Sequence, residues 1–188
     1  MIHYITGGER SGKSSFAQSL AEQMSATPYY LATSRVLDEN FAKRVQRHVH
    51  DRAESSCQWT TIEADLNLTE ALQRYFNQHK SDSEQYNHIP VIVIDCVTLW
   101  LTNYVMDYNY DIEQCLTLAK QEVDSLVTFA NQHSATLFII SNEIGMSLHA
   151  STAEGRQFVS LQGWVNQYLA QVADKATLVV SGLPVVLK

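Results

Sequence analysis

The strongest chemical signal in the sequence is a glycine-rich loop in its first fourteen residues. It matches the phosphate-binding pattern G-x-x-x-x-G-K-[ST] in full. Glycines allow several backbone N–H groups to face one anion, and the start of a following helix adds partial positive charge. Lys13 would then carry a cation to the β- and γ-phosphates of a nucleotide, and the Ser14 hydroxyl could bind Mg²⁺. The residues predicted to bind the nucleotide here are Gly7, Gly8, Glu9, Arg10, Ser11, Gly12, Lys13 and Ser14.

The competing interpretation of this loop is a glycine-rich turn that matches by chance. Its context argues against chance, because the apolar stretch Ile2–Thr6 precedes it and an amphipathic stretch from about Lys13 to Met24 follows. The loop therefore joins a strand to a helix, as the motif requires. Arg10 places a further cation inside the loop, either beside the phosphates or in solvent.

An acidic residue ends the clearest buried strand of the sequence. Pro90–Asp95 reads PVIVID, with four β-branched residues in a row. In a fold that contains this phosphate loop, an acid at that place holds Mg²⁺ directly or through water. Asp95 could instead, or in addition, cap the helix that starts at Val97. Asn142-Glu143 follow the apolar stretch Thr136–Ser141 in the same way, and either position substrate or metal or form an ordinary polar loop.

A third group of candidates contains a histidine. Arg44, His48 and Arg52 are spaced i, i+4 and i+8, which places them on one face of a continuous helix. Guanidinium groups disfavour protonation of a nearby imidazole and leave a neutral nitrogen able to attack phosphorus. They can also hold phosphate oxygens. From the spacing alone, however, a solvated cationic helix face is the better interpretation.

Strand and helix patterns alternate along almost the whole chain. This alternation predicts a P-loop NTPase-like three-layer α/β fold, in which helices cover both faces of a mainly parallel sheet. A tight turn at Gly182-Leu183-Pro184 predicts an antiparallel last strand. Without a linker or a repeat, residues 1–188 are expected to form a single domain. The expected strands are Ile2–Thr6, Tyr29–Ala32, Trp59–Ile62, Pro90–Asp95, Thr136–Ser141, Thr177–Ser181 and Val185–Leu187. Three expected helices are Lys13–Met24, Leu68–His79 and Arg156–Ala173. Three more are a segment that Asp38 caps and that runs towards Arg52, a stretch that starts near Thr98, and a stretch that follows the polar break at Asp107–Asp111 and runs to Gln132. Lys80–His88 is expected to be a surface loop.

The composition limits the possible partners. The chain has 188 residues, 45% of them hydrophobic, and a formal net charge of -7, which argues against a nucleic-acid-binding surface. Its three cysteines are far apart and form no C-x-x-C pair, so we expect neither a zinc site nor a disulfide scaffold. The sequence starts without a signal-peptide pattern and has no apolar run near 18 residues. A cytoplasmic protein without membrane contact is therefore expected.

Taken in order, the motifs resemble those of the bifunctional adenosylcobinamide kinase / adenosylcobinamide-phosphate guanylyltransferase family. The resemblance runs the whole length, with small departures at Val45, Arg47 and Val49 around the histidine motif. It is carried by I-T-G-G-x-R-S-G-K-S at 5–14, Y-L-A-T-S at 30–34, R-V-x-x-H-x-x-x-R at 44–52, W-x-T-x-E at 59–63, D-C-V-T-L-W-x-x-N at 95–103, S-N-E-I-G at 141–145, G-x-x-N-Q-x-L-A-x-x-A-D at 163–174 and V-V-S-G-L-P at 179–184.

The resemblance implies two reactions. ATP or GTP phosphorylates the hydroxyl of the aminopropanol arm of adenosylcobinamide, with Lys13 and with Mg²⁺ bound by Ser14 and Asp95. His48 then attacks the α-phosphorus of GTP and passes GMP to adenosylcobinamide phosphate, which gives adenosylcobinamide-GDP. The resemblance also implies a homotrimer, for which Trp100 and Trp164 could serve the interface or, equally, the core. Further nucleotide contacts are implied at Thr33, Ser34, Arg35, Val49, His50, Asp51, Arg52, Glu63 and Asp95.

Two other functions remain open at this point. One is a P-loop kinase of another small metabolite, in which the histidine is structural. The other is a non-catalytic nucleotide-binding regulator, against which the joint presence of Lys13, Ser14 and Asp95 argues.

Overall fold

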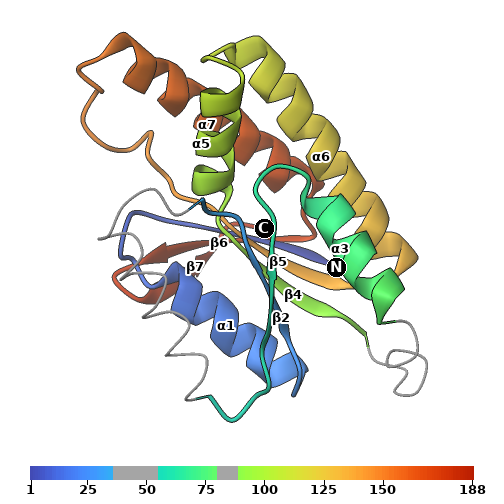
Figure 1. The fold of residues 1–188 in the computed structure, drawn as a ribbon. Coiled ribbons are helices and arrows are strands. Elements are labelled where there is room, and N and C mark those ends of the chain that lie inside the picture. The colour runs from blue at the N-terminus through green and yellow to red at the C-terminus, as the bar shows by residue number, and fades with distance from the viewer. Residues whose placement is uncertain (36–54, 80–88) are drawn as a thin grey trace.

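The computed structural model describes residues 1–35, 55–79 and 89–188, which form one seven-stranded sheet flanked by helices (Figure 1). The strand order is β3-β2-β4-β5-β1-β6-β7, and every pair is parallel except β6 and β7. This confirms the predicted fold class, including the antiparallel last strand. The strands are β1 (Ile2–Thr6), β2 (Tyr29–Ala32), β3 (Thr60–Glu63), β4 (Val91–Asp95), β5 (Thr136–Ile140), β6 (Lys175–Val180) and β7 (Leu183–Val186).

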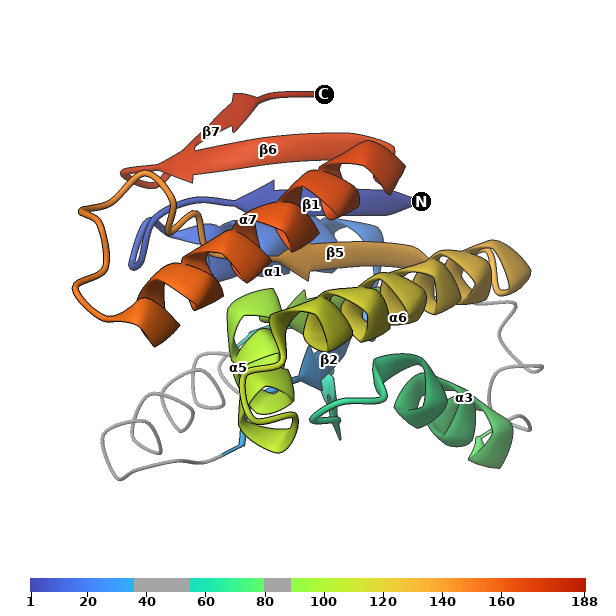
Figure 2. The ribbon, with the colours of Figure 1, turned by 90° about the horizontal axis from the view of Figure 1, so that it is seen from above.

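Helices cover both faces of the sheet. The helices are α1 (Lys13–Met24), α3 (Leu68–Gln78), α5 (Val97–Asp107), α6 (Ile112–Gln132) and α7 (Ala153–Val172). Figure 1 shows α1 on one face, and α3, α5, α6 and α7 on the other. Figure 2 shows the same four helices lying across the sheet on one side, with α1 behind it.

Strand β4 shows why the central strands read as unbroken apolar runs. Val91 and Val93 pack in the cluster that contains Ala17 and Ala21 of α1. Ile92 and Ile94 pack in the larger cluster under the opposite helices. Successive side chains of a strand point to opposite faces, so a strand covered on both faces has no solvent position for a polar residue.

Some boundaries differ from those predicted. Strand β3 begins at Thr60, and α7 begins at Ala153, before the expected Arg156, because the Thr152 hydroxyl oxygen accepts a 3.0 Å hydrogen bond from the N–H of Gly155 and starts the helix earlier.

The predicted turn at Gly182-Leu183-Pro184 was also wrong in its extent. Ser181 and Gly182 form the turn, whereas Leu183 and Pro184 already belong to β7. Proline fits there because β7 is an edge strand, where a missing backbone N–H costs no ladder hydrogen bond. The expected helix from Asp38 towards Arg52 and the segment Lys80–His88 lie outside the described residues. No helix in the described part of the chain is both long and apolar enough to cross a membrane.

Parallel strands bring the predicted site together at one edge. Strands β1, β5, β4, β2 and β3 run in the same direction, so their carboxyl ends share one edge of the sheet. The phosphate loop follows β1, Asn142-Glu143 follow β5, and Asp95 ends β4. Ala32 at the end of β2 pairs with Asp95 on one side and Glu63 on the other.

Candidate active site

The phosphate loop depends on two glycines whose backbone other residues could not adopt. Gly7 has φ of 154°, and a Cβ added there would lie 2.3 Å from the carbonyl oxygen of Val179 on β6. Gly12 has φ of 97° and stands directly before α1, where an added Cβ would lie 3.2 Å from Cα of Gly182. The loop can therefore turn tightly against β6 and the β6–β7 turn only because these positions lack side chains.

Backbone hydrogen bonds hold the loop from two sides. The N–H of Glu143, after β5, donates to the Gly7 carbonyl at 2.9 Å. The N–H of Gly182, in the β6–β7 turn, donates to the Ser11 carbonyl at 2.8 Å. The loop is thus fixed between segments that come from the second half of the chain.

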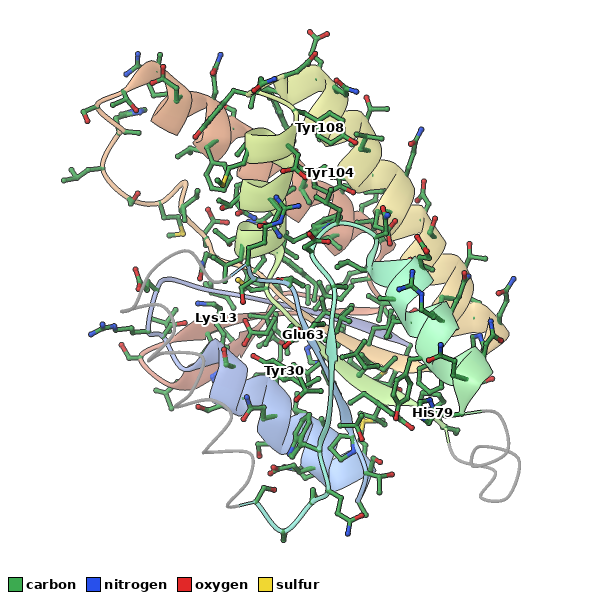
Figure 3. The ribbon with its side chains drawn as sticks, in the orientation of Figure 1. Lys13, Tyr30, Glu63, His79, Tyr104 and Tyr108 are labelled. Carbon is green, nitrogen blue, oxygen red and sulfur yellow. The ribbon has the colours of Figure 1, made fainter. Side chains whose placement is uncertain are left out.

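Lys13 is buried, with 6% of its surface exposed, and its ammonium group lies inside the curl of the loop. Nζ donates to the Gly8 carbonyl at 2.5 Å and to Ser11 Oγ at 3.5 Å. Figure 3 shows Lys13 at the start of α1, in the same part of the molecule as Tyr30 and Glu63. A cation in this position, beside the N–H groups at the start of α1, provides the charge that a triphosphate requires.

Asp95 faces the loop through a direct contact with the helix start. Its Oδ2 accepts hydrogen bonds from Ser14 Oγ at 2.7 Å and from the Tyr30 hydroxyl at 2.9 Å. The alternative role of Asp95 as helix cap is wrong, because Cys96 occupies the N-cap position of α5 and no side chain caps that helix. The Asp95 carboxylate is instead oriented towards α1, on the side of the nucleotide loop.

The residues that follow β2 have structural partners of their own. The Thr33 hydroxyl is fully buried, donates to the Cys96 carbonyl and accepts from the Cys96 N–H, both at 2.8 Å, so it fixes the corner after Asp95. Arg35 binds Asp107 through both terminal nitrogens, at 2.6 and 2.8 Å, and Asp65 through Nε at 3.0 Å. These bonds raise the pKa of the Arg35 guanidinium, and those to Asp107 contribute most. In turn, the hydrogen bonds from Arg35 hold the pKa of the Asp107 carboxyl below its usual range. Ser34 is half-buried beside them.

The structure describes some of the remaining predicted site residues and leaves others outside the described ranges. Glu63 is exposed at the end of β3. Arg10 and Glu9 are exposed in the loop, and Arg10 has a left-handed backbone with φ of 56°. The nucleophile candidate His48, and Val49, His50, Asp51 and Arg52, lie outside the residues that the structure describes.

Cys96 is not a candidate nucleophile, although it lies next to Asp95. Burial, and then the negative charge of Asp95, raise the pKa of its thiol to about 12, so the thiol stays protonated at neutral pH. No group of three or more His, Cys, Asp or Glu side chains suited to a metal ion occurs within residues 1–35, 55–79 and 89–188.

Three supporting residues were not predicted as part of the site. Tyr30 binds Asp95, and the buried Asn103 of α5 donates to the carbonyls of Thr33 and Asp65, both at 2.8 Å. Asn166 of α7 donates to the Asn142 carbonyl at 3.0 Å. Tyr30, Asn103 and Asn166 all occur in the stretches that carry the family resemblance, which was the available signal.

The two tryptophans considered for an interface have different surroundings. Trp100 is 1% exposed, and its indole N–H donates to the Leu66 carbonyl at 2.9 Å, so it belongs to the core. Trp164, on α7, is 46% exposed.

Comparison with known proteins agrees with this arrangement. A family model described as cobinamide kinase / cobinamide phosphate guanyltransferase matches residues 3–187. The bifunctional adenosylcobalamin biosynthesis protein CobU of Escherichia coli (strain K12) is 32% identical over 195 positions, which take in 100% of each chain. The bifunctional adenosylcobalamin biosynthesis protein CobP of Pseudomonas aeruginosa is 31% identical over 188 positions, covering 100% of this chain and 98% of the relative. The CobU protein of Salmonella typhimurium is 30% identical, with 100% of each chain covered. A family match of this extent, on a chain whose phosphate loop and strand-end acid are in contact, confirms the resemblance seen in the sequence: the chain belongs to the cobinamide kinase / cobinamide phosphate guanyltransferase family.

Proposed function

We propose that this chain is a bifunctional enzyme of adenosylcobalamin biosynthesis. It phosphorylates the hydroxyl of adenosylcobinamide with ATP or GTP, and then transfers GMP from GTP to the phosphorylated product through a guanylyl-His48 intermediate. The full-length family match supports both activities. The 2.7 Å contact between Ser14 and Asp95 at the start of α1 is the structural observation that most favours the phosphoryl transfer.

The described residues suit phosphoryl transfer by position and charge. Lys13 holds its ammonium within the loop, and α1 begins there, so both face the place of a triphosphate. Little covalent chemistry is required of the protein in this reaction, because catalysis rests on orientation and on stabilisation of the charge that develops on the transferring group.

The same residues fit Mg²⁺. This ion prefers oxygen ligands and is usually bound by one or two protein side chains together with phosphate oxygens and waters. The Ser14 hydroxyl and the Asp95 carboxylate are such ligands, and they are already adjacent. When bound there, Mg²⁺ would neutralise charge on the β- and γ-phosphate oxygens.

The guanylyl transfer is assigned to His48 on the sequence resemblance. In this step, an imidazole nitrogen forms a bond to the α-phosphorus of GTP, and pyrophosphate leaves. The phosphate oxygen of the acceptor then displaces the imidazole and takes GMP. Val49, His50, Asp51, Arg52 and Glu63 are proposed to contact the nucleotide, and a homotrimer in the cytoplasm is the proposed form of the enzyme.

The test is to trap the intermediate with GTP labelled on its α-phosphate. The chain is incubated with labelled GTP and Mg²⁺, denatured, and separated from free nucleotide. We expect protein-bound label that is acid-labile and alkali-stable, and its loss in His48→Ala. His79→Ala is the matched control, because His79 lies at the end of α3, far from Lys13 in Figure 3, and should leave the label unchanged.

Two results would contradict the proposal in different ways. No label on the wild-type protein, beside normal phosphorylation of adenosylcobinamide, would leave a kinase without a guanylyl step. Label that survives in His48→Ala would move the nucleophile to another residue. Phosphorylation is followed separately, with γ-labelled ATP or GTP and adenosylcobinamide.

A further inference from the structure

The loop after β5 opens between the two halves of the nucleotide site. In the sheet, β5 lies between β1, which leads into the phosphate loop, and β4, which ends in Asp95. Ile140 pairs with Ile5 of β1 on one side and with Asp95 of β4 on the other. The residues that follow β5 therefore emerge between the phosphate loop and Asp95.

A buried polar network fixes the direction of this loop. Ser141 Oγ donates to Asn166 Oδ1 at 2.6 Å, and Gln162 Nε2 donates to Ser141 Oγ at 2.9 Å. The main chain of Asn142 is held on both sides, because its N–H donates to Thr98 Oγ1 at 3.2 Å and its carbonyl accepts from Asn166 Nδ2 at 3.0 Å. At most 6% of the surface of Ser141, Gln162 and Asn166 is exposed, so the anchor to α7 is buried. The anchor to α5 is the half-buried Thr98.

The next residue, Glu143, is tied directly to the phosphate loop. Its backbone N–H donates to the Gly7 carbonyl at 2.9 Å. Its side chain is half-buried, and Oε1 accepts a 3.0 Å hydrogen bond from the N–H of Gly145. A Cβ added at Gly145 would lie 3.1 Å from that oxygen. The carboxylate thus has a defined orientation beside the loop that would hold the phosphates.

Three other acids near this edge have partners of another kind. Asp95 accepts from Ser14 and Tyr30 and is proposed above as a metal ligand. Asp65 and Asp107 are paired with Arg35. The Glu143 carboxylate, by contrast, has an N–H group as its hydrogen-bond donor, and no ion pair involving it is seen among the residues that the structure describes.

We propose that Glu143 is the catalytic base of the phosphoryl transfer, which deepens the kinase half of the proposed function and rests on it. The carboxylate accepts the proton of the acceptor alcohol as the O–H bond breaks. The electron pair of that oxygen forms the new bond to the γ-phosphorus. The bond from the γ-phosphorus to the β–γ bridging oxygen breaks, and its electrons leave with the nucleoside diphosphate. The proton on Glu143 passes to water when the product departs.

This assignment separates the two activities. The guanylyl transfer starts from an acceptor that already carries a phosphate, so its nucleophile has no hydroxyl proton to lose. A change confined to the Glu143 carboxylate should therefore slow phosphorylation and spare guanylylation. Loss of a general base typically lowers kcat by about 10²- to 10⁴-fold.

The experiment compares wild type with Glu143→Gln, which keeps an oxygen for the Gly145 N–H and leaves the backbone contact with Gly7 unchanged. Phosphorylation of adenosylcobinamide, guanylylation of synthetic adenosylcobinamide phosphate, and binding of a fluorescent GTP analogue are measured on the same preparations. We expect at least a 100-fold fall in kcat for phosphorylation, with guanylylation and nucleotide affinity within about threefold of wild type. Glu154→Gln, in the first turn of α7, is the matched control and should match wild type in all three.

Three outcomes count against the assignment. Phosphorylation by Glu143→Gln at the wild-type rate would show that the carboxylate accepts no proton. Loss of nucleotide affinity together with both activities would show that the side chain only supports the loop. A wild-type chain that guanylylates but does not phosphorylate would refute the kinase half of the proposed function, and the role of Glu143 with it. Failure of guanylylation alone would refute only the other half.

Discussion

Removal of the Tyr30 hydroxyl should weaken the site without disturbing the core around it. Tyr30 is 6% exposed, and its hydroxyl donates a 2.9 Å hydrogen bond to Asp95. In Tyr30→Phe the ring can keep its edge-to-face contact with Trp59, whose centroid lies 6.4 Å away. The substitution therefore removes the hydrogen bond to the Asp95 carboxylate and keeps the ring.

The size of the effect follows from the charge and exposure of the acceptor. A hydrogen bond to a charged group contributes about 1.5–3 kcal/mol to the free energy of unfolding. Asp95 is half-buried, so water can replace part of the lost hydrogen bond. We therefore expect the free energy of unfolding to fall by about 1–2 kcal/mol. For a domain of this size that corresponds to a fall in Tm of roughly 2–8 °C.

A second effect should appear in metal binding. A side chain that orients a metal ligand typically changes metal affinity or activity by about 10- to 100-fold when it is removed. We therefore expect the Mg²⁺ concentration for half-maximal phosphorylation to rise by about tenfold in Tyr30→Phe. Urea and thermal unfolding measure the stability effect, and a Mg²⁺ titration of the initial rate at saturating nucleotide measures the second.

The matched control is Tyr75→Phe on α3. Tyr75 is also partly buried among aromatic rings, but its hydroxyl has no hydrogen-bond partner in the described part of the chain. Tyr75→Phe should lower the free energy of unfolding by less than about 0.5 kcal/mol and leave the Mg²⁺ dependence of phosphorylation unchanged. Equal losses of stability in the two variants, or an unchanged Mg²⁺ dependence in Tyr30→Phe, would refute the role assigned to the Tyr30 hydroxyl.

Three further predictions concern the loop, a buried histidine and the end of the last helix. Gly7→Ala should lower the free energy of unfolding in a urea titration by about 3 kcal/mol or more, because its Cβ would lie 2.3 Å from the Val179 carbonyl oxygen. Gly8→Ala is the control, because a Cβ there meets no atom within 4 Å. It should change the free energy of unfolding by less than about 1 kcal/mol. Burial lowers the pKa of His3 below 6.5, so below that pH the unfolded chain binds more protons than the folded chain. The unfolding free energy should then fall as the pH decreases from about 6.5, by at most about 1.4 kcal/mol per pH unit, and urea titrations from pH 7.5 to 5 should show a flatter profile for His3→Gln. Lys188 donates to three carbonyls at the end of α7, at 2.7 to 3.3 Å, so Lys188→Ala should cost about 1 kcal/mol in chemical unfolding.

Local patterns were sufficient to predict the central strands and the loop between β1 and α1. Strands β1, β4 and β5 are covered on both faces, so their sequences carry unbroken apolar runs that admit few other structures. The bounds of α1 agree with the prediction, because the phosphate motif fixes where the helix starts.

The partners of the site residues could not be predicted in the same way. Tyr30 and Asp95 are 65 positions apart and meet only because β2 and β4 are neighbours in the sheet. Arg35 looked free to bind phosphate, yet its acidic partners come from the end of α5 and from the segment after β3. Contacts of this kind depend on strand order and loop direction, which no short stretch of sequence encodes.

The contact between Gly182 and Ser11 has a consequence for the newly made protein. The loop with the phosphate motif is synthesised before Glu143, Val179 and Gly182, against which it rests. A nascent chain that has exposed only α1 and β2 therefore lacks the supports that give its anion pocket a shape. We therefore expect that GTP does not stabilise fragments truncated before the β6–β7 turn.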